Sequence, residues 1–283
     1  MDQHYFRPTS LSDALALRSE RPSATVVAGG TDVMVAVNEG RRRLDEVIDL
    51  GDVAELGGWD LDGDRVRVGA TLPLTRVTDE LAAHLPALAA AARLVGSPPI
   101  RHRATLGGNI ATASPAGDTL LPMLAGDSSI EVASVRGIRE VRSDEFFLGP
   151  GRTVLAPDEL ITAVRATTAR GEAFAKTGTR RAMVISVAAA AVRIDPERRH
   201  LGVALGSVAP TPRRARTAEA FGARELDWSA RTAPDEGWWA ELGRRAASDT
   251  APIDDLRGTA DHRRRVTAVL VARCARQAWS RTC

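Results

Sequence analysis

The chain has 283 residues, enough for one large domain or for two to three smaller domains with sizeable cores. Hydrophobic residues make up 44% of it and charged residues 26%, as in an ordinary globular protein. The net charge is only +2, from 38 basic and 36 acidic residues. No excess of one sign therefore favours nucleic acid or an anionic membrane as a partner.

The sequence shows no sign of secretion or membrane insertion. We expect no signal peptide, because the first residues lack a charged segment followed by an apolar run, and no stretch approaches the roughly 18 apolar residues of a membrane span. The two cysteines, Cys274 and Cys283, are too few for an iron–sulfur cluster, which usually needs four thiolates. We expect two unpaired thiols in a cytoplasmic protein.

The first 55 residues are predicted to contain a compact β-turn-α-β unit. A helix over 9–20 precedes the unit, with Ser10 as its N-cap. The β-rich run ATVVA at 24–28 leads through GGTD into a helix over 33–40. The run EVIDL at 46–50 is then the second strand.

Residues 56–170 are predicted to hold several strands and helices. The expected strands are LGGWDL, RVRVGA, SIEVAS, IREVRS and ELITAVRA, at residues 56–61, 65–70, 129–134, 138–143 and 159–166. An Ala-rich helix over 81–95 is interrupted only by Pro86, and GSPPI breaks it. The next segment, RATLGGNIATASPAGD at 103–118, has almost no bulky side chains and is expected to be a loop. Asp118 is expected to cap the helix after it.

The pattern changes near residue 170, where we expect a domain boundary. Beyond it, the runs EAFAKTG, VISVAAAAVRID and HLGVALGSVAP predict a three-stranded antiparallel meander. Two or three helices are expected to follow, including one over 259–279 that is apolar on one face and rich in arginine on the other.

Two glycine-rich segments indicate a binding site. VAGGTD at 27–32 lies between a strand and a helix, and TLGGN at 105–109 repeats the glycine pair with Thr105 and Asn109 as side-chain donors. Glycines allow positive φ and leave room for a ligand, so successive backbone N–H groups can point at one anion. The two loops are therefore predicted to grip a pyrophosphate from opposite sides, although neither matches the GxGxxG or Walker pattern.

Five segments of the chain, in order, resemble a known family. The FAD-binding subunits of molybdenum hydroxylases, of the xanthine dehydrogenase and carbon monoxide dehydrogenase type, contain segments similar to VAGGTDVMV, IRHRATLGGNIATASPAGDTLLPMLAGD, GPGRTVLAPDELI, FAKTGTRRAMVISVAAAAV and LGSVAPTPRRARTAEA. The resemblance implies an α+β fold. A two-subdomain FAD-binding domain of the vanillyl-alcohol oxidase (PCMH) type would occupy 1–170, divided at about residue 55. A domain like the C-terminal domain of the carbon monoxide dehydrogenase flavoprotein, with a three-stranded antiparallel sheet and helices, would occupy 171–283.

By position, the resemblance also implies which residues bind FAD. Asp118 would reach the adenosine ribose, Ile161 would pack near the flavin, and Lys176 would lie near the isoalloxazine. Two pyrophosphate loops complete the site, and Thr112 and Val95 are weaker parallels to the family. The implied cofactor-binding residues other than Val95 are Val27, Ala28, Gly29, Gly30, Thr31, Asp32, Val33, Met34, Thr105, Leu106, Gly107, Gly108, Asn109, Thr112, Asp118, Ile161 and Lys176. No side chain is implied to be catalytic, because FAD carries the redox chemistry, and we expect no metal site.

Three of these residues also have a simpler interpretation. Asp118 is equally placed to cap a helix. Ile161 is an apolar residue in a predicted strand, where core packing is the default. Lys176 is the only lysine in the chain, which suggests that a compact point charge is required there, although a solvated surface lysine is the alternative.

The resemblance implies partner subunits as well. A molybdopterin-binding large subunit would hydroxylate the substrate, and a small subunit would carry two 2Fe–2S clusters. The FAD of this chain would pass their electrons to NAD⁺ or another acceptor, within a dimer of heterotrimers. Two alternatives stay open: a stand-alone flavin-dependent oxidase or dehydrogenase of the same fold, and a flavin-free scaffold subunit. The short chain with its single Tyr5 disfavours the first, and the two intact glycine loops disfavour the second.

Overall fold

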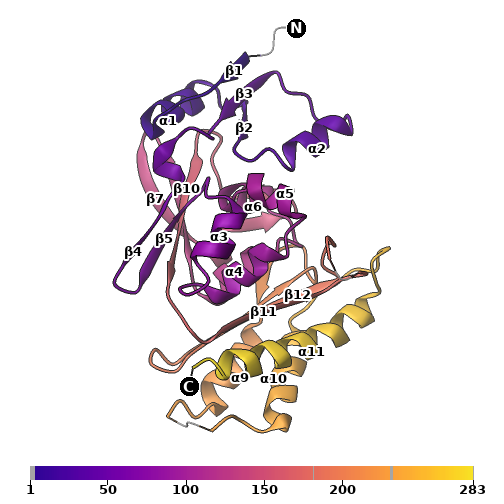
Figure 1. Ribbon diagram of the computed structural model, residues 1–283. Coiled ribbons are helices and arrows are strands. Elements are labelled where there is room, and N and C mark those ends of the chain that lie inside the picture. Colours follow the sequence, from indigo (N-terminus) through magenta and orange to yellow (C-terminus); the bar gives the residue numbers. More distant parts are fainter. Residues whose placement is uncertain (1–3, 181, 230–231, 283) are drawn as a thin grey trace.

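The computed structural model describes residues 4–180, 182–229 and 232–282. Within them, three main sheets follow one another along the chain and from the top to the bottom of Figure 1. The first has three parallel strands, the second has five antiparallel strands, and the third has four antiparallel strands. This arrangement is the mixed α+β class that the sequence predicts.

The N-terminal sheet contains the predicted β-turn-α-β unit. Strands β2 (Thr25–Val27) and β3 (Glu46–Asp49) pair in parallel and are joined through helix α2 (Val33–Asn38). Strand β1 (His4–Phe6), too short to be predicted, adds to the other edge of β3. Helix α1 (Leu11–Glu20) begins at the predicted cap, where the Ser10 hydroxyl oxygen accepts a hydrogen bond of 3.1 Å from the Asp13 amide.

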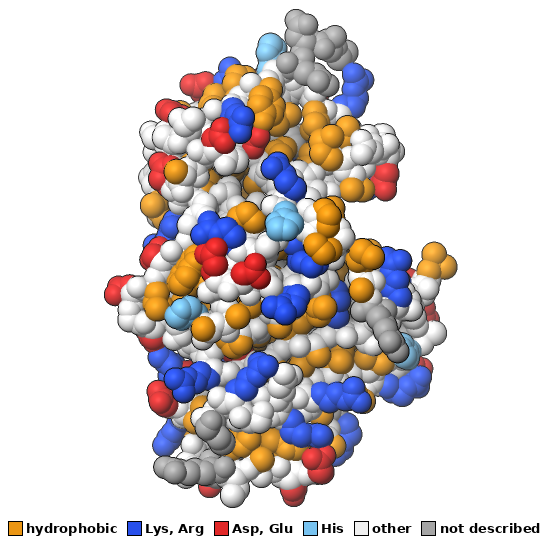
Figure 2. All heavy atoms as spheres, viewed as in Figure 1, with side chains coloured by type: hydrophobic (Ala, Val, Ile, Leu, Met, Phe, Trp, Pro, Cys, Tyr) orange, Lys and Arg blue, Asp and Glu red, His pale blue; other side chains and the backbone are white. Residues whose placement is uncertain are grey.

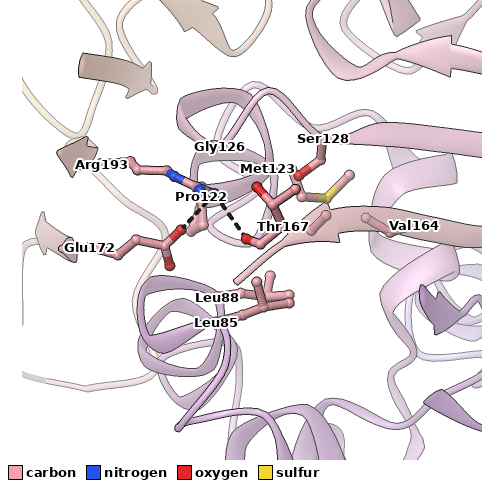
Figure 3. Close-up of a pocket in the computed structure, with 11 residues that line it drawn as sticks. Leu85, Leu88, Pro122, Met123, Gly126, Ser128, Val164, Thr167, Glu172 and Arg193 are labelled. Carbon is pink, nitrogen blue, oxygen red and sulfur yellow. Dashed lines mark hydrogen bonds and ion pairs between the residues drawn. The ribbon is translucent and has the colours of Figure 1, made fainter. Parts of the chain in front are cut away.

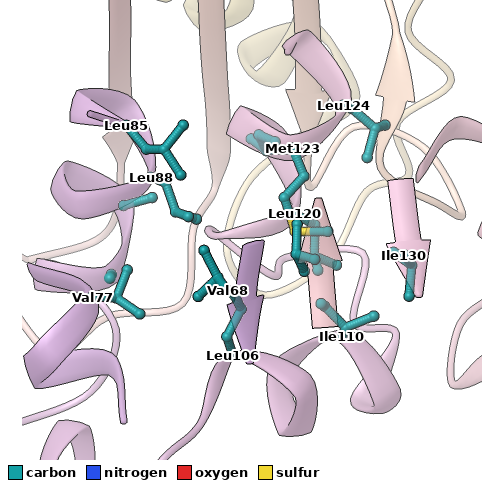
Figure 4. Packing of buried hydrophobic residues seen from close by; sticks show 14 of the residues in the cluster. Val68, Val77, Leu85, Leu88, Leu106, Ile110, Leu120, Met123, Leu124 and Ile130 are labelled. Atoms are coloured by element: carbon teal, nitrogen blue, oxygen red, sulfur yellow. The ribbon is translucent and has the colours of Figure 1, made fainter. Parts of the chain in front are cut away.

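The central sheet has the strand order β4-β5-β10-β6-β7 and is antiparallel throughout. Its strands are β4 (Trp59–Asp62), β5 (Arg65–Gly69), β10 (Leu160–Thr167), β6 (Ser129–Ser134) and β7 (Gly137–Arg142). The helices packed with it are α3 (Leu74–Glu80), α4 (Pro86–Arg93), α5 (Pro98–Arg103), α6 (Leu106–Thr112) and α7 (Leu120–Ala125). Apolar side chains of α3, α4, α6 and α7 form one core with the strand residues Val68 and Ile130 (Figure 4). The short elements are η1 (Ala54–Leu56), α8 (Ser143–Phe146), β8 (Phe147–Gly149) and β9 (Arg152–Thr153).

The C-terminal sheet contains the predicted meander and one further strand. Its strands are β11 (Glu172–Thr177), β12 (Ala188–Asp195), β13 (His200–Gly206) and the two-residue β14 (Arg213–Arg214), so the sheet has four strands rather than three. The helices are α9 (Arg216–Glu225), α10 (Glu236–Ser248) and α11 (Ala260–Trp279). Every residue of β12 is buried, because α11 packs against the sheet and α7 of the preceding domain also contacts it.

Cys274 lies on α11 as a free and buried thiol. Burial raises the pKa of this thiol to about 12, so it stays protonated and packs as a small apolar side chain. Cys283 lies outside the described residues. None of the helices in the described ranges combines the length and apolarity that a membrane crossing requires.

The structure also corrects the predictions for two segments that contain proline or glycine. The helix expected over 81–95 is interrupted at 81–85, and α4 begins at Pro86, because proline is well tolerated in the first turn of a helix. The segment GSPPI separates two helices as predicted, since α4 ends at Arg93, and the same tolerance of proline lets Pro98 and Pro99 start the next helix, α5. The second correction concerns 103–118, part of which is helical and forms one side of the candidate site.

Candidate functional site

A cleft of about 700 Å³ lies between the N-terminal sheet and the helices that accompany the central sheet. In Figure 1 the segment around α2 lies above α5 and α6, and the outline of the molecule is notched there in Figure 2. The volume of the cleft is within the range of small-molecule and cofactor sites. The sequence-predicted residues that line the cleft are Val27, Ala28, Gly29, Gly30, Thr31, Asp32, Val33, Val95, Thr105, Gly108, Asn109 and Thr112. The structure thus brings most of the two predicted segments together.

The first glycine pair is required by the geometry of the loop. An ideal Cβ atom on Gly29 would lie 1.9 Å from the carbonyl oxygen of Arg103, so any side chain here would collide with the backbone at the end of α5. Gly30 has a φ of +72°, in the left-handed region that favours glycine. The pair therefore turns the chain sharply from β2 into α2 while pressing it against α5.

The same loop presents unused hydrogen-bond donors. The backbone N–H groups of residues 29–33 have no acceptor among the described residues, although the following amide, that of Met34, bonds to the Gly30 carbonyl oxygen at 2.9 Å. Unpaired backbone donors are costly when they are shielded from water, so such a run needs water or a ligand as its partner. Successive amides on a turn that leads into a helix are a typical cradle for a phosphate.

The second glycine pair is not in a loop. Residues 106–112 form α6, and the hydroxyl oxygen of Thr105 caps this helix by accepting a hydrogen bond of 3.1 Å from the Gly108 amide. The amides of Leu106, Gly107 and Asn109 donate to the carbonyl oxygens of Leu72, Ala70 and Thr105. In this structure the second segment therefore contributes no free backbone donors across 106–109, contrary to the two-sided amide grip predicted from sequence.

Side chains on α6 connect it to the first loop and to the cleft. Thr112 Oγ1 lies 2.7 Å from Asp32 Oδ2, a contact that joins the two sides of the cleft. Thr119 donates a hydrogen bond of 2.6 Å to Asn109 Oδ1, which orients the Asn109 amide. The nitrogen of that amide has no protein acceptor in the described ranges, so it is a donor available beside the cleft.

Six predicted residues do not line this cleft. Met34 is half exposed on α2, and Leu106 and Gly107 are buried against the sheet, where a Cβ atom on Gly107 would lie 2.6 Å from Ala70 Cβ. Ile161 is buried in β10 as part of the central core. The remaining two are Asp118 and Lys176.

Asp118 and Lys176 form a buried ion pair between the two domains. Lys176 Nζ lies 2.6 Å from Asp118 Oδ2 and also donates to the carbonyl oxygens of Leu94 and Val184, at 3.1 and 3.2 Å. Ser186 donates to Asp118 Oδ1 at 2.7 Å. Burial raises the pKa of Asp118, and the neighbouring Lys176 and Ser186 oppose that rise. Lys176 is therefore not a solvated surface lysine.

The cap expected at Asp118 is not formed. Helix α7 begins after Thr119 and has no side-chain cap, because the Asp118 carboxylate is bonded to Lys176 and Ser186 instead. The sequence resemblance placed Asp118 at the adenosine and Lys176 at the isoalloxazine. Their side chains are in direct contact, so the two residues lie together in the fold, and neither lines the cleft.

The sequence analysis missed several residues of the cleft wall. Those not predicted from sequence include Arg41, Arg42, Gly96, Ile100, Ala104 and Gly151. Arg42 is held in place by a hydrogen bond of 3.1 Å from its guanidinium to Thr25 Oγ1. The run of three arginines at 41–43 was a readable signal, because cationic side chains next to a predicted phosphate loop suit a diphosphate.

Comparisons with known proteins identify the family. Residues 1–166 match the family model described as the FAD binding domain in molybdopterin dehydrogenase. Residues 173–278 match the CO dehydrogenase flavoprotein C-terminal domain.

The chain belongs to the FAD-binding subunits of the molybdenum hydroxylase family. This confirms the family, the FAD cofactor and the oxidoreductase class that the sequence predicts.

Two curated members of the family illustrate the similarity. The chain is 36% identical, over 76% of its length and 77% of the relative, to a putative xanthine dehydrogenase FAD-binding subunit of Escherichia coli. It is 32% identical, over 98% of both chains, to the nicotine 6-hydroxylase medium subunit of Paenarthrobacter nicotinovorans. A solved chain of carbon monoxide dehydrogenase from Hydrogenophaga pseudoflava has the same fold, with a TM-score of 0.88, 29% identity and coverage of 99% and 98%.

Proposed function

We propose that the 700 Å³ cleft holds FAD with its diphosphate on the free amides of residues 29–33. Arg41 and Arg42 line the same cleft; Arg41 is paired with Glu39, whereas Arg42 bonds only the neutral Thr25 hydroxyl among the described residues and supplies positive charge, and the Asn109 amide supplies a further donor. Asp118 and Lys176 would lie at one end of the cofactor, where the two domains meet. We also propose domain boundaries at 1–170 and 171–283, with subdomains that divide at about residue 55.

FAD, when bound, supplies electron-transfer chemistry, because it accepts and releases both single electrons and pairs. The chain's own residues would bind and orient the cofactor. We propose that this subunit accepts electrons from 2Fe–2S clusters of a partner subunit and passes them to NAD⁺ or another acceptor. The substrate would be hydroxylated in a molybdopterin-binding subunit, in a complex that is a dimer of heterotrimers. The multi-subunit relatives support this proposal.

The run of free amides at residues 29–33 carries the proposal, and a substitution at Gly29 tests it. Gly29→Val would displace the loop from Arg103, whereas Gly58→Ala is a matched control because no atom lies within 4 Å of the added carbon. In the native complex, isolated through a tag on this chain, Gly29→Val should remove the flavin. Substrate should still bleach the iron–sulfur absorbance, but delivery of electrons to the acceptor should stop.

Gly58→Ala should leave both activities intact. A chain that purifies without partners and oxidises a substrate by itself would overturn the proposed electron-transfer role. Normal flavin content in the Gly29→Val complex would overturn the assignment of the cleft.

A further inference from the structure

The segment that joins α4 to α5 forms part of the cleft wall. Val95, Gly96 and Ile100 all line the cleft. Gly96 has a φ of +52°, and an ideal Cβ atom on it would lie 2.7 Å from Ile100 Cγ2. The turn is therefore packed tightly on α5, and the position of this wall depends on how its backbone is held.

Three successive carbonyl groups of this turn are held by two cationic side chains. Lys176 Nζ donates to the Leu94 carbonyl oxygen at 3.1 Å. One guanidinium nitrogen of Arg101, Nη1, donates to the carbonyl oxygens of Val95 and Gly96 at 3.1 and 2.9 Å. Carbonyls at the end of a helix lack intrahelical partners and carry partial negative charge, so cationic donors stabilise them.

Arg101 acts from outside the cleft. It lines a separate hollow of about 340 Å³ together with Arg93 and His102, and it is not among the residues that line the larger cleft. Arg101 therefore binds the backbone of Val95 and Gly96 from the side of the smaller hollow, while these two residues line the larger cleft on the other side. The same helix, α5, ends at Arg103, whose carbonyl oxygen abuts Gly29. Any movement of α5 would be transmitted to the wall and to the amide loop together.

We propose that Arg101 is a positioning residue for FAD, which fixes both the wall at residues 95–96 and the helix that supports the phosphate-binding loop. The proposal rests on the assignment of the larger cleft to FAD. It predicts that the loss of Arg101 weakens flavin binding, although the Arg101 side chain does not line the cleft. It also predicts that a lysine at this position, which retains a cationic donor, restores part of the affinity.

The test compares Arg101→Met with Arg93→Met in the full-length chain, stripped of flavin and titrated with FAD. Arg93 is a matched control, because its side chain lines the same hollow and makes no hydrogen bond or ion pair with the residues that the structure describes. We expect the FAD dissociation constant to rise about tenfold in Arg101→Met, as for the loss of hydrogen bonds from a charged group. Arg93→Met should match the wild type, and Arg101→Lys should fall between.

The melting temperature of the flavin-free chain separates positioning from general stability. Equal melting temperatures for Arg101→Met and Arg93→Met, with different FAD affinities, support the proposal. If Arg101→Met does not fold, Arg101→Gln replaces it, because a shorter neutral amide does not reach both carbonyls. Wild-type affinity in the folded variant overturns the proposal. Gly29→Val, measured in parallel, tests the assignment of the cleft to FAD. If Gly29→Val loses flavin while the Arg101 variant binds it normally, only the positioning role of Arg101 is refuted.

Discussion

Thr112 Oγ1 lies 2.7 Å from Asp32 Oδ2 and 2.9 Å from the carbonyl oxygen of Gly108. The hydroxyl has one proton, and a carboxylate is a stronger acceptor than a carbonyl group. The contact therefore joins the end of α6 to the start of α2, 80 residues earlier in the chain. It holds the two sides of the cleft at a fixed separation.

This contact predicts a difference between two substitutions at Thr112. Thr112→Val removes the hydroxyl and should weaken FAD binding about fivefold, because a partly exposed hydrogen bond to a charged group contributes about 1 kcal/mol. Thr112→Ser keeps the hydroxyl and should bind FAD as the wild type does. Fluorescence titration of the flavin-free chain measures both, and equal affinities in the two variants would contradict a bridging role.

The glycines of the two segments should differ in their tolerance of alanine. Gly29→Ala places a carbon 1.9 Å from a backbone oxygen, whereas Gly108→Ala places it 3.0 Å from the adjustable Thr105 hydroxyl. We expect Gly29→Ala to weaken FAD binding at least tenfold and Gly108→Ala to change it less than threefold, on the scale that one tenfold step is about 1.4 kcal/mol. Flavin-to-protein ratios after gel filtration provide the comparison. Similar losses in both variants would mean that the second segment also approaches the ligand closely.

The buried pair of Lys176 and Asp118 predicts strong coupling in a double-mutant cycle. Lys176→Met leaves the Asp118 carboxyl buried without its cation, which should reduce the free energy of unfolding by about 3 kcal/mol. Asp118→Asn in the same chain removes the uncompensated charge, so the double variant should be more stable than the sum of the two single losses. Urea denaturation of all four proteins measures the cycle, and strict additivity would refute the coupling.

Glu172 predicts how stability changes with pH. Its carboxylate lies beside a small cavity of about 10 Å³ between the domains, 3.7 Å from the Arg193 guanidinium (Figure 3). Burial raises the pKa of Glu172 to about 7, and Arg193 only partly opposes this. Between pH 4.5 and 7 the folded chain holds a proton that the unfolded chain has lost, so the contribution of Glu172 to stability falls as the pH rises.

The loss expected across this range is about 3 kcal/mol, from roughly 1.4 kcal/mol for each pKa unit. Glu172→Gln should remove it, so the variant should gain stability relative to the wild type above pH 7. Glu197→Gln is the matched control, because this glutamate is exposed. Thermal melts at a series of pH values test the prediction, and parallel curves for Glu172→Gln and the wild type would exclude it.

The sequence was sufficient to predict the helices and strands that have strong local residue patterns. The β2-turn-α2-β3 unit and the neighbouring strands β4 and β5 are predicted because turn glycines and alternating apolar residues are local patterns. Helix α6 was missed because two glycines lower helix propensity. The helix forms all the same, because Thr105 caps it and Leu106 and Ile110 are buried.

The sequence could not predict which hydrogen-bond donors of the site already have an acceptor within the protein. The amides of Leu106 and Gly107 are used by Leu72 and Ala70, which lie more than 30 residues earlier in the chain. Ser186 reaches Asp118 from 68 residues away. Such pairings depend on how the domains pack, so local patterns identified the residues of the cleft but not which of their donors are free.

Hydrogen exchange of the backbone amides at residues 29–33 tests the central claim most directly. These amides have no acceptor among the described residues, so they should exchange fast in the flavin-free chain. FAD should slow their exchange strongly, while the amides of residues 106–109, already bonded within the protein, should change much less. Unchanged exchange at 29–33 on saturation with FAD would show that the diphosphate lies elsewhere and would contradict the site proposed for this chain.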